Sequence, residues 1–126
     1  MMPGKYNMIC SQGATFSKRL TWTIDGNPVD LTGYTAEMQA REKYTSTNAI
    51  FTLSTSDGSI TLDDEGNIDI LINADDTENI VPKDYVYDLE LNSGAEIYRI
   101  IEGKFIVTPE VTRTWAGQNL YLKSLT

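Results

Sequence analysis

The sequence predicts an all-β protein, an antiparallel sandwich of about eight strands, with a small barrel as the alternative. Apolar and polar residues alternate with a period of two along most of the chain, which is typical of strands with one buried and one solvated face. Turn residues recur at intervals of roughly ten residues. Only one short segment has a helical pattern, so we expect little helix.

The first clear strand is expected over residues 16–24, where the apolar residues share one face. Trp22 lies on that face and is predicted to be core, whereas Lys18 interrupts it and marks a strand at a sheet edge. Asp25-Gly26 followed by Asn27-Pro28 predicts a reversal, because glycine favours positive φ and proline interrupts strand pairing. A second long strand follows, with an inner face made by Tyr34, Ala36, Met38 and Ala40.

Three shorter strands are expected over residues 50–53, 60–62 and 68–72. Polar loops at 43–49 and 54–59 connect them, and the acidic loop 63–67 closes a hairpin between the last two. Residues 74–80 break the alternation and predict one helical turn, since Asp75 and Asp76 suit a helix N-terminus and Pro82 prevents continuation.

The segment 85–100, YVYDLELNSGAEIYRI, is expected to form a hairpin with Ser93-Gly94 at its tip. This turn would place Asp88 opposite Arg99, with Tyr85, Tyr87, Leu89 and Leu91 facing inward. Opposite-charge cross-strand pairs stabilise a sheet by about 0.2–1 kcal/mol and help to fix its register. We therefore expect a structural role for these charges. The alternative, an acid and base pair of Asp88 and Glu90, requires a cleft and pKa values driven apart.

A further strand is expected over 103–107, closed by Pro109. The remaining residues are less regular, so we divide the chain into a β-sandwich domain at 1–113 and a C-terminal arm at 114–126. The arm is predicted to bind a partner, because extended apolar segments add a strand to another subunit or fill its groove. The alternative is one more strand of its own sandwich. The predicted contact residues are Trp115, Leu120, Tyr121, Leu122 and Leu125.

Composition argues against several classes of partner. Ten basic and eighteen acidic residues give a net charge of -8, so nucleic acid would be repelled and is not expected as a partner. The N-terminus has no apolar signal region and the chain has no apolar run of about eighteen residues, so we expect no membrane partner. The single cysteine, Cys10, is predicted to be a small core residue.

Catalytic and metal-binding patterns are also missing. The chain has no histidine and one cysteine, which removes the usual general base and the ligands of a structural zinc site. Acidic clusters at 63–65 and 75–78 could suit calcium, but they lack the ordered EF-hand spacing and are expected to be solvated turn carboxylates. We therefore expect a protein that is not an enzyme and has no cofactor and no metal.

A series of motifs resembles a family of small proteins and modules from tailed bacteriophages and prophages. The series runs through a Trp-bearing strand, DGNPVDLTGYTA at 25–36, YVYDLEL at 85–91, RIIEG at 99–103 and PEVTR at 109–113. It is similar to the "dG-p-dLTGyta", "YDLel", "riieG" and "peVTR" series of that family. The match covers roughly residues 14–113, and the family is close to the N-terminal module of the baseplate upper protein. The five motifs occur in the same order and at similar spacings, which is unlikely by chance.

The resemblance implies an immunoglobulin-like sandwich and a structural or assembly role in the virion, in the tail, the baseplate or the head surface. It carries over no catalytic residues. Larger family members continue into receptor-binding or fibre regions, whereas this chain ends shortly after Arg113. We therefore expect an accessory or adaptor module that is made in the host cytoplasm. Its expected partners are other phage structural proteins, in a homo-oligomer or symmetric assembly. The alternative is a carbohydrate-binding module for host glycans, which requires at least two coplanar exposed aromatic residues on one strand face.

Overall fold

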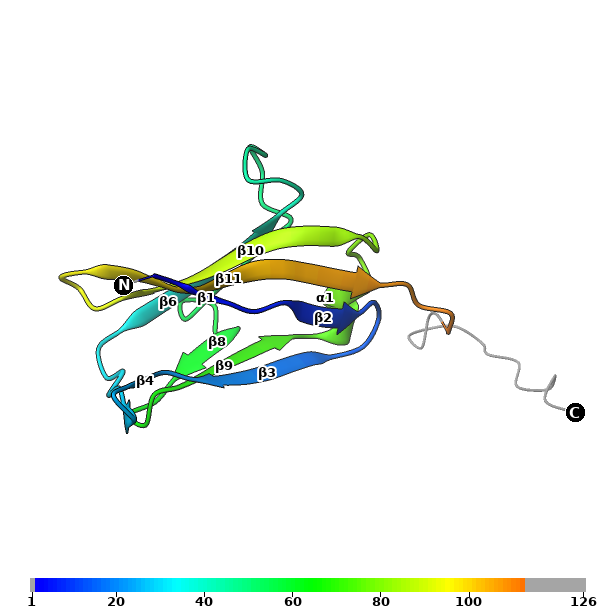
Figure 1. The fold of residues 1–126 in the computed structure, drawn as a ribbon. Coiled ribbons are helices and arrows are strands. Elements are labelled where there is room, and N and C mark those ends of the chain that lie inside the picture. Colours follow the sequence, from blue (N-terminus) through cyan, green and yellow to red (C-terminus); the bar gives the residue numbers. More distant parts are fainter. Residues whose placement is uncertain (1, 113–126) are drawn as a thin grey trace, which may run out of the picture.

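The computed structural model describes residues 2–112, which form two packed β-sheets and a small hairpin (Figure 1). The elements are β1 (Gly4–Lys5), β2 (Met8–Ser11), β3 (Phe16–Thr21), β4 (Thr23–Ile24), β5 (Asn27–Pro28), β6 (Thr35–Arg41), β7 (Phe51–Ser54), β8 (Ile60–Leu62), β9 (Asn67–Ile72), α1 (Ala74–Thr77), β10 (Asp84–Asn92) and β11 (Ile97–Thr108). The larger sheet has the order β1-β11-β10-β6-β7, with β2 also paired to β11, and the smaller sheet has the order β3-β9-β8. The predicted all-β sandwich is confirmed.

The centre of the larger sheet follows the predicted alternation. β10 pairs with β6 in antiparallel orientation over seven residue pairs, from Val86↔Arg41 to Asn92↔Thr35. The inner faces of both strands are buried, as predicted. They consist of Ala36, Met38, Ala40, Tyr85, Tyr87, Leu89 and Leu91. The predicted connections 43–49 and 54–59, the hairpin of β8 and β9 and the helical turn α1 also form where the sequence indicated.

The edge beside β11 differs from the predicted purely antiparallel arrangement. β1 and β2 run parallel to β11 in one continuous register, from Gly4↔Ile101 to Ser11↔Thr108. Gly103 makes this approach possible, because a Cβ there would lie 2.3 Å from the Tyr6 carbonyl oxygen. That oxygen accepts a hydrogen bond of 2.6 Å from the Tyr87 hydroxyl. The first and last described strands of the chain are therefore neighbours in one sheet.

The predicted register of the β10–β11 hairpin is wrong. The turn spans four residues, 93–96, instead of two, so Arg99 lies opposite Glu90 rather than Asp88. A β-bulge then inserts one extra residue in β11 at 100, beyond which Leu89 faces Ile101 and Asp88 faces Glu102. The predicted separate strand at 103–107 is also wrong, because residues 97–108 form one bent strand.

The smaller sheet has β3 at one edge, as the interruption at Lys18 predicted. Lys18 shares the core-facing side of β3 with Phe16 and Leu20, yet its ammonium lies over the Tyr6 ring, 4.9 Å from the centroid. The predicted reversal after this strand is the β4–β5 hairpin, whose turn residues Asp25 and Gly26 have φ values of 52° and 81°. Ile24 was predicted to face the core but is 54% exposed, because the chain has already left the sheet at β4.

One core lies between the two sheets and contains two aromatic groups. Phe105 is fully buried and packs edge-on against Phe16 of the smaller sheet and Phe51 of the larger, with ring centroids 5.3 and 5.0 Å away. Trp22 packs between Tyr34 and Tyr98, with ring centroids 6.3 and 5.5 Å away. It is partly buried and lies at the margin of the core. Cys10 is buried, as predicted.

The connection between β9 and β10 crosses from one sheet to the other and carries α1. Thr77 of α1 is buried and bonded on both sides, since its hydroxyl donates to the Ala14 carbonyl and accepts from the Gly13 amide. At the start of β10, the Tyr85 hydroxyl donates a hydrogen bond of 2.5 Å to the Val81 carbonyl. These bonds fix the corner where the chain changes sheets. Within the described residues, no helix has the length and apolar character needed to cross a membrane.

Candidate functional site

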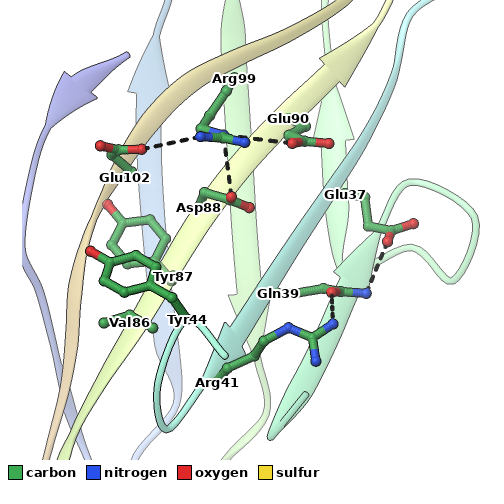
Figure 2. A pocket seen from close by; sticks show the side chains of 10 residues that line it. All are labelled: Glu37, Gln39, Arg41, Tyr44, Val86, Tyr87, Asp88, Glu90, Arg99 and Glu102. Carbon is green, nitrogen blue, oxygen red and sulfur yellow. Dashed lines mark hydrogen bonds and ion pairs between the residues drawn. The ribbon is translucent and has the colours of Figure 1, made fainter. Parts of the chain in front are cut away.

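The charged residues of β10 lie on the outer face of the larger sheet, in a shallow depression of about 350 Å³. Side chains from β6, β10, β11 and the β6–β7 loop line it, and Figure 2 shows the charged side chains of the three strands on its outer face. The loop projects from the larger sheet on the side away from the smaller sheet (Figure 1) and forms one wall. We call this surface the outer-face depression.

Arg99 is the centre of the outer-face depression. Its Nε atom lies 3.3 Å from Asp88 Oδ2 and 3.7 Å from Glu90 Oε2, and its Nη1 atom lies 3.6 Å from Glu102 Oε1 (Figure 2). Glu102 also forms an ion pair with Lys5 of β1. The predicted contact between Asp88 and Arg99 is therefore present, although the two residues are not directly opposite. The Arg99 guanidinium therefore forms ion pairs with three carboxylates from two strands.

The β-bulge brings Glu102 into this group. Residues three apart on a regular strand point to opposite faces, but the extra residue at 100 places Arg99 and Glu102 on the same face. The register also puts like charges directly opposite each other, in the pairs Asp88↔Glu102 and Glu90↔Glu37. Such pairs destabilise a sheet. Arg99 offsets this repulsion by lying among Asp88, Glu90 and Glu102.

The surroundings shift the pKa values of two of these carboxyl groups in opposite directions. Partial burial, followed by the charge of Glu90, raises the pKa of Asp88, and Arg99 opposes that rise. The hydrogen bond from Lys5 lowers the pKa of Glu102. An open, shallow depression in which Arg99 already pairs with both Asp88 and Glu90 favours the expected structural role over an acid and base pair.

A second chain of contacts runs along β6. The Glu37 carboxylate accepts from the Gln39 amide at 3.1 Å, and the Gln39 carbonyl oxygen accepts from Arg41 at 2.8 Å. The other end of the Arg41 guanidinium donates to the loop carbonyls of Ser46 and Thr47 at 3.0 and 2.9 Å. Arg41 therefore holds the β6–β7 loop upright against the sheet. The same loop presents Tyr44, which is 84% exposed.

The predicted partner-binding residues Trp115, Leu120, Tyr121, Leu122 and Leu125 lie outside the described residues. The acidic loop at 63–67 has a structural role, because Asp63 accepts from the backbone amides of Glu65 and Asn67 at 2.8 and 2.9 Å. Within residues 2–112, no three acidic, cysteine or histidine side chains converge into a group that could hold a metal ion.

Sequence reasoning missed three members of the outer-face depression. Glu102 was missed because the apolar and polar alternation does not reveal the bulge. Glu37 was missed because the strand that lies beside β6 depends on the strand order of the sheet. Tyr44 was assigned only to a polar connection, although a lone tyrosine among small polar residues, KYTSTN, is itself an indication of an exposed contact. No family model matches this chain, and no curated protein is significantly similar to it.

Proposed function

We propose that this protein is a non-enzymatic structural protein of a tailed-bacteriophage virion that acts through protein-protein contacts. It serves as an accessory module in the tail, the baseplate or the head surface, and is incorporated after synthesis in the host cytoplasm. Its partners are other phage structural proteins, in a symmetric assembly that includes further copies of the chain. The proposal rests on the motif series at 25–113 and on how those motifs are used in the fold.

The strand order supports an immunoglobulin-like sandwich. In immunoglobulin nomenclature β3, β9 and β8 correspond to strands B, E and D, and β6, β7, β10 and β11 correspond to C, C′, F and G. The bond from the Tyr85 hydroxyl to the Val81 carbonyl at the corner before β10 corresponds to the tyrosine corner of that fold. This correspondence supports the immunoglobulin-like part of the proposal.

The observation that carries the proposal is the position of the motif residues. In DGNPVDLTGYTA, Leu31 is buried and Asp30 caps the turn by accepting from the Thr32 amide and hydroxyl. RIIEG contains both the bulge of β11 and Gly103, the point of close approach to β1. These two motifs thus supply a turn, a core residue, a bulge and a close approach between strands, which supports reading the shared series as the description of one fold.

The outer-face depression suits contact with a protein surface. It is shallow, it carries interspersed charges, and Arg41 and Arg99 hold it rigid through the contacts described above. The carbohydrate-binding alternative has less support. Of the aromatic side chains within residues 2–112, only Tyr6 and Tyr44 are exposed, and they line different depressions rather than one strand face.

The test is incorporation into particles. The full chain, tagged at its N-terminus, is produced during growth of the phage that encodes it, and virions and subassemblies are purified by density gradient. We expect the tagged chain at a fixed stoichiometry to the major structural proteins, measured by quantitative mass spectrometry. The control is Leu89→Asp, which places a charge in the core and should abolish incorporation by unfolding the module. A wild-type chain that enters neither particles nor subassemblies would contradict the proposal.

A further inference from the structure

The free edge of β1 and β2 is an unpaired strand edge of the larger sheet. Within the described part of the chain, both strands pair only with β11. The amides of Tyr6 and Gln12 donate to β11 at Glu102 and Thr108, each at 3.0 Å. Because alternate residues direct their backbone groups to the same side, the amides of Lys5, Asn7 and Ile9 point away from β11. We call residues 4–11 the acceptor edge.

The other three sheet edges carry features that discourage strand addition. Lys18 is an inward-facing charge on the β3 edge. On the β7 edge the Ser59 hydroxyl bonds to both the amide and the carbonyl of Ser54, at 2.9 and 3.3 Å. The β8 edge is only three residues long. By contrast the acceptor edge presents Ile9, which is 67% exposed.

An apolar groove of about 290 Å³ lies beside the acceptor edge, on the open side of the sandwich between β1 and β3. Lys5 and Tyr6 line the groove together with apolar residues of both sheets and with Trp22; the sheet residues are Leu20, Ile68, Ile100 and Ile101. An extended segment that paired with the edge could therefore also place apolar side chains against the core margin.

We propose that residues 113–126 of a second copy of this chain occupy the acceptor edge and its groove. This inference rests on the proposed function, since it supplies the contact by which copies assemble. The segment carries Leu120 and Leu122 two residues apart, so in an extended conformation both would point to the same face, with Tyr121 and Lys123 on the other. That pattern fits a strand with one side against an apolar groove.

The path of the chain favours a second copy over the same one. Residues 109–112 lead away from the sandwich beyond the end of β11 (Figure 1), and Val111 is 91% exposed. The Gln12 side chain holds the start of this path. Its Oε1 atom accepts a hydrogen bond from the Glu110 backbone amide, and its Nε2 atom donates one to the Ile80 backbone carbonyl. The described part of the chain therefore ends at a fixed point, on a path that leads away from the sandwich.

The segment is long enough for this role. Fourteen residues reach at most about 46–50 Å when extended, whereas the acceptor edge from Lys5 to Ser11 needs about 20 Å. Roughly half of the segment can pair while the remainder spans the gap between copies. The contact is head-to-tail, so successive copies close into a ring or continue as a filament.

Two substitutions in the full chain test each half of the contact. Ile9→Pro removes one backbone amide that points away from β11 and leaves the hydrogen bonds to β11 intact. Thr52→Pro is its control, because it removes an amide that points away from the sheet at the opposite edge, on β7. Leu122→Asp places a charge on the apolar face of the segment, and Ser124→Asp adds the same charge at a polar position. We expect wild type and both controls to associate, and Ile9→Pro and Leu122→Asp to raise the dissociation constant by about tenfold or more, by light scattering and sedimentation.

Mixing the two defective variants is the decisive experiment. The Ile9→Pro chain keeps an intact segment and the Leu122→Asp chain keeps an intact edge, so an equimolar mixture should form a complex of two chains. A monomeric wild type, an Ile9→Pro chain that associates like wild type, or a mixture that forms no complex would each overturn the inference. Circular dichroism checks that all variants are folded. Light scattering and sedimentation measure the mass of the purified chain, without any other phage protein. A chain that associates in these measurements but never enters particles would therefore contradict only the proposed function.

Discussion

Gly103 shows how one residue controls a strand pairing. Adding a Cβ there would bring it within 2.3 Å of the Tyr6 carbonyl oxygen, so Gly103→Ala must displace β1 from β11. We expect a loss of about 1–3 kcal/mol in the free energy of unfolding, measured with urea. Gly4→Ala is the control, since its Cβ would meet the nearest atom, Ile100 O, at an ordinary 3.6 Å. Equal unfolding midpoints for the two variants would refute this explanation.

A second prediction at the residue scale concerns Tyr85. Its side chain is buried and its hydroxyl bonds to the Val81 carbonyl at the corner before β10. Tyr85→Phe removes this bond with little change in packing, so we expect the free energy of unfolding to fall by about 1 kcal/mol. Thermal and urea unfolding measure the effect. Tyr44→Phe, which changes an exposed ring in the same way, should leave stability unaltered, and a similar loss there would undermine the prediction.

At the scale of single elements, the β8–β9 loop is organised by Asp63. Hydrogen bonds from Asn67 and Glu65 lower the pKa of this carboxyl below its ordinary value of 3.8. A lowered pKa in the folded state stabilises the protein above the unfolded pKa, and this contribution is lost as the pH falls through the folded pKa. Wild type should therefore exceed Asp63→Ala in thermal midpoint at pH 7, and the difference should shrink below pH 3.8. Asp64→Ala serves as the neighbouring control, and a difference that does not depend on pH would contradict this account.

Elements that carry their own signal were predictable from the sequence. β6 shows uninterrupted alternation, β9 alternates except at Leu71, and α1 lies between a strand and a proline. β1 and β2 have little pattern, because their pairing depends on Gly103 near the other end of the described chain. The meeting of Asp88 and Arg99 followed from their spacing around a turn. The grouping of three carboxylates around Arg99 could not be predicted in this way. It depends on the register, which the turn length and the bulge determine, and neither is visible in the apolar periodicity.

At the scale of the whole molecule, Phe105 connects the two sheets and makes them one cooperative unit. Its ring contacts Phe16 in the smaller sheet and Phe51 in the larger. Phe105→Ala should lower the free energy of unfolding by about 3–5 kcal/mol. Circular dichroism in the far and near ultraviolet should give the same lowered midpoint. Val111→Ala, at a position that is 91% exposed, should change little. Two separate transitions in the Phe105 variant would show that the sheets unfold independently.

The parallel pairing of β1 and β2 with β11 also determines how the module responds to force. A load applied between the start of β1 and the end of β11 pulls the two strands in opposite directions along their length. The hydrogen bonds between them are then loaded together, in shear, rather than opened one after another as in a peeled hairpin. Such a ladder resists extension until all of its bonds fail at once. The sandwich is thus built as a mechanical clamp along this axis.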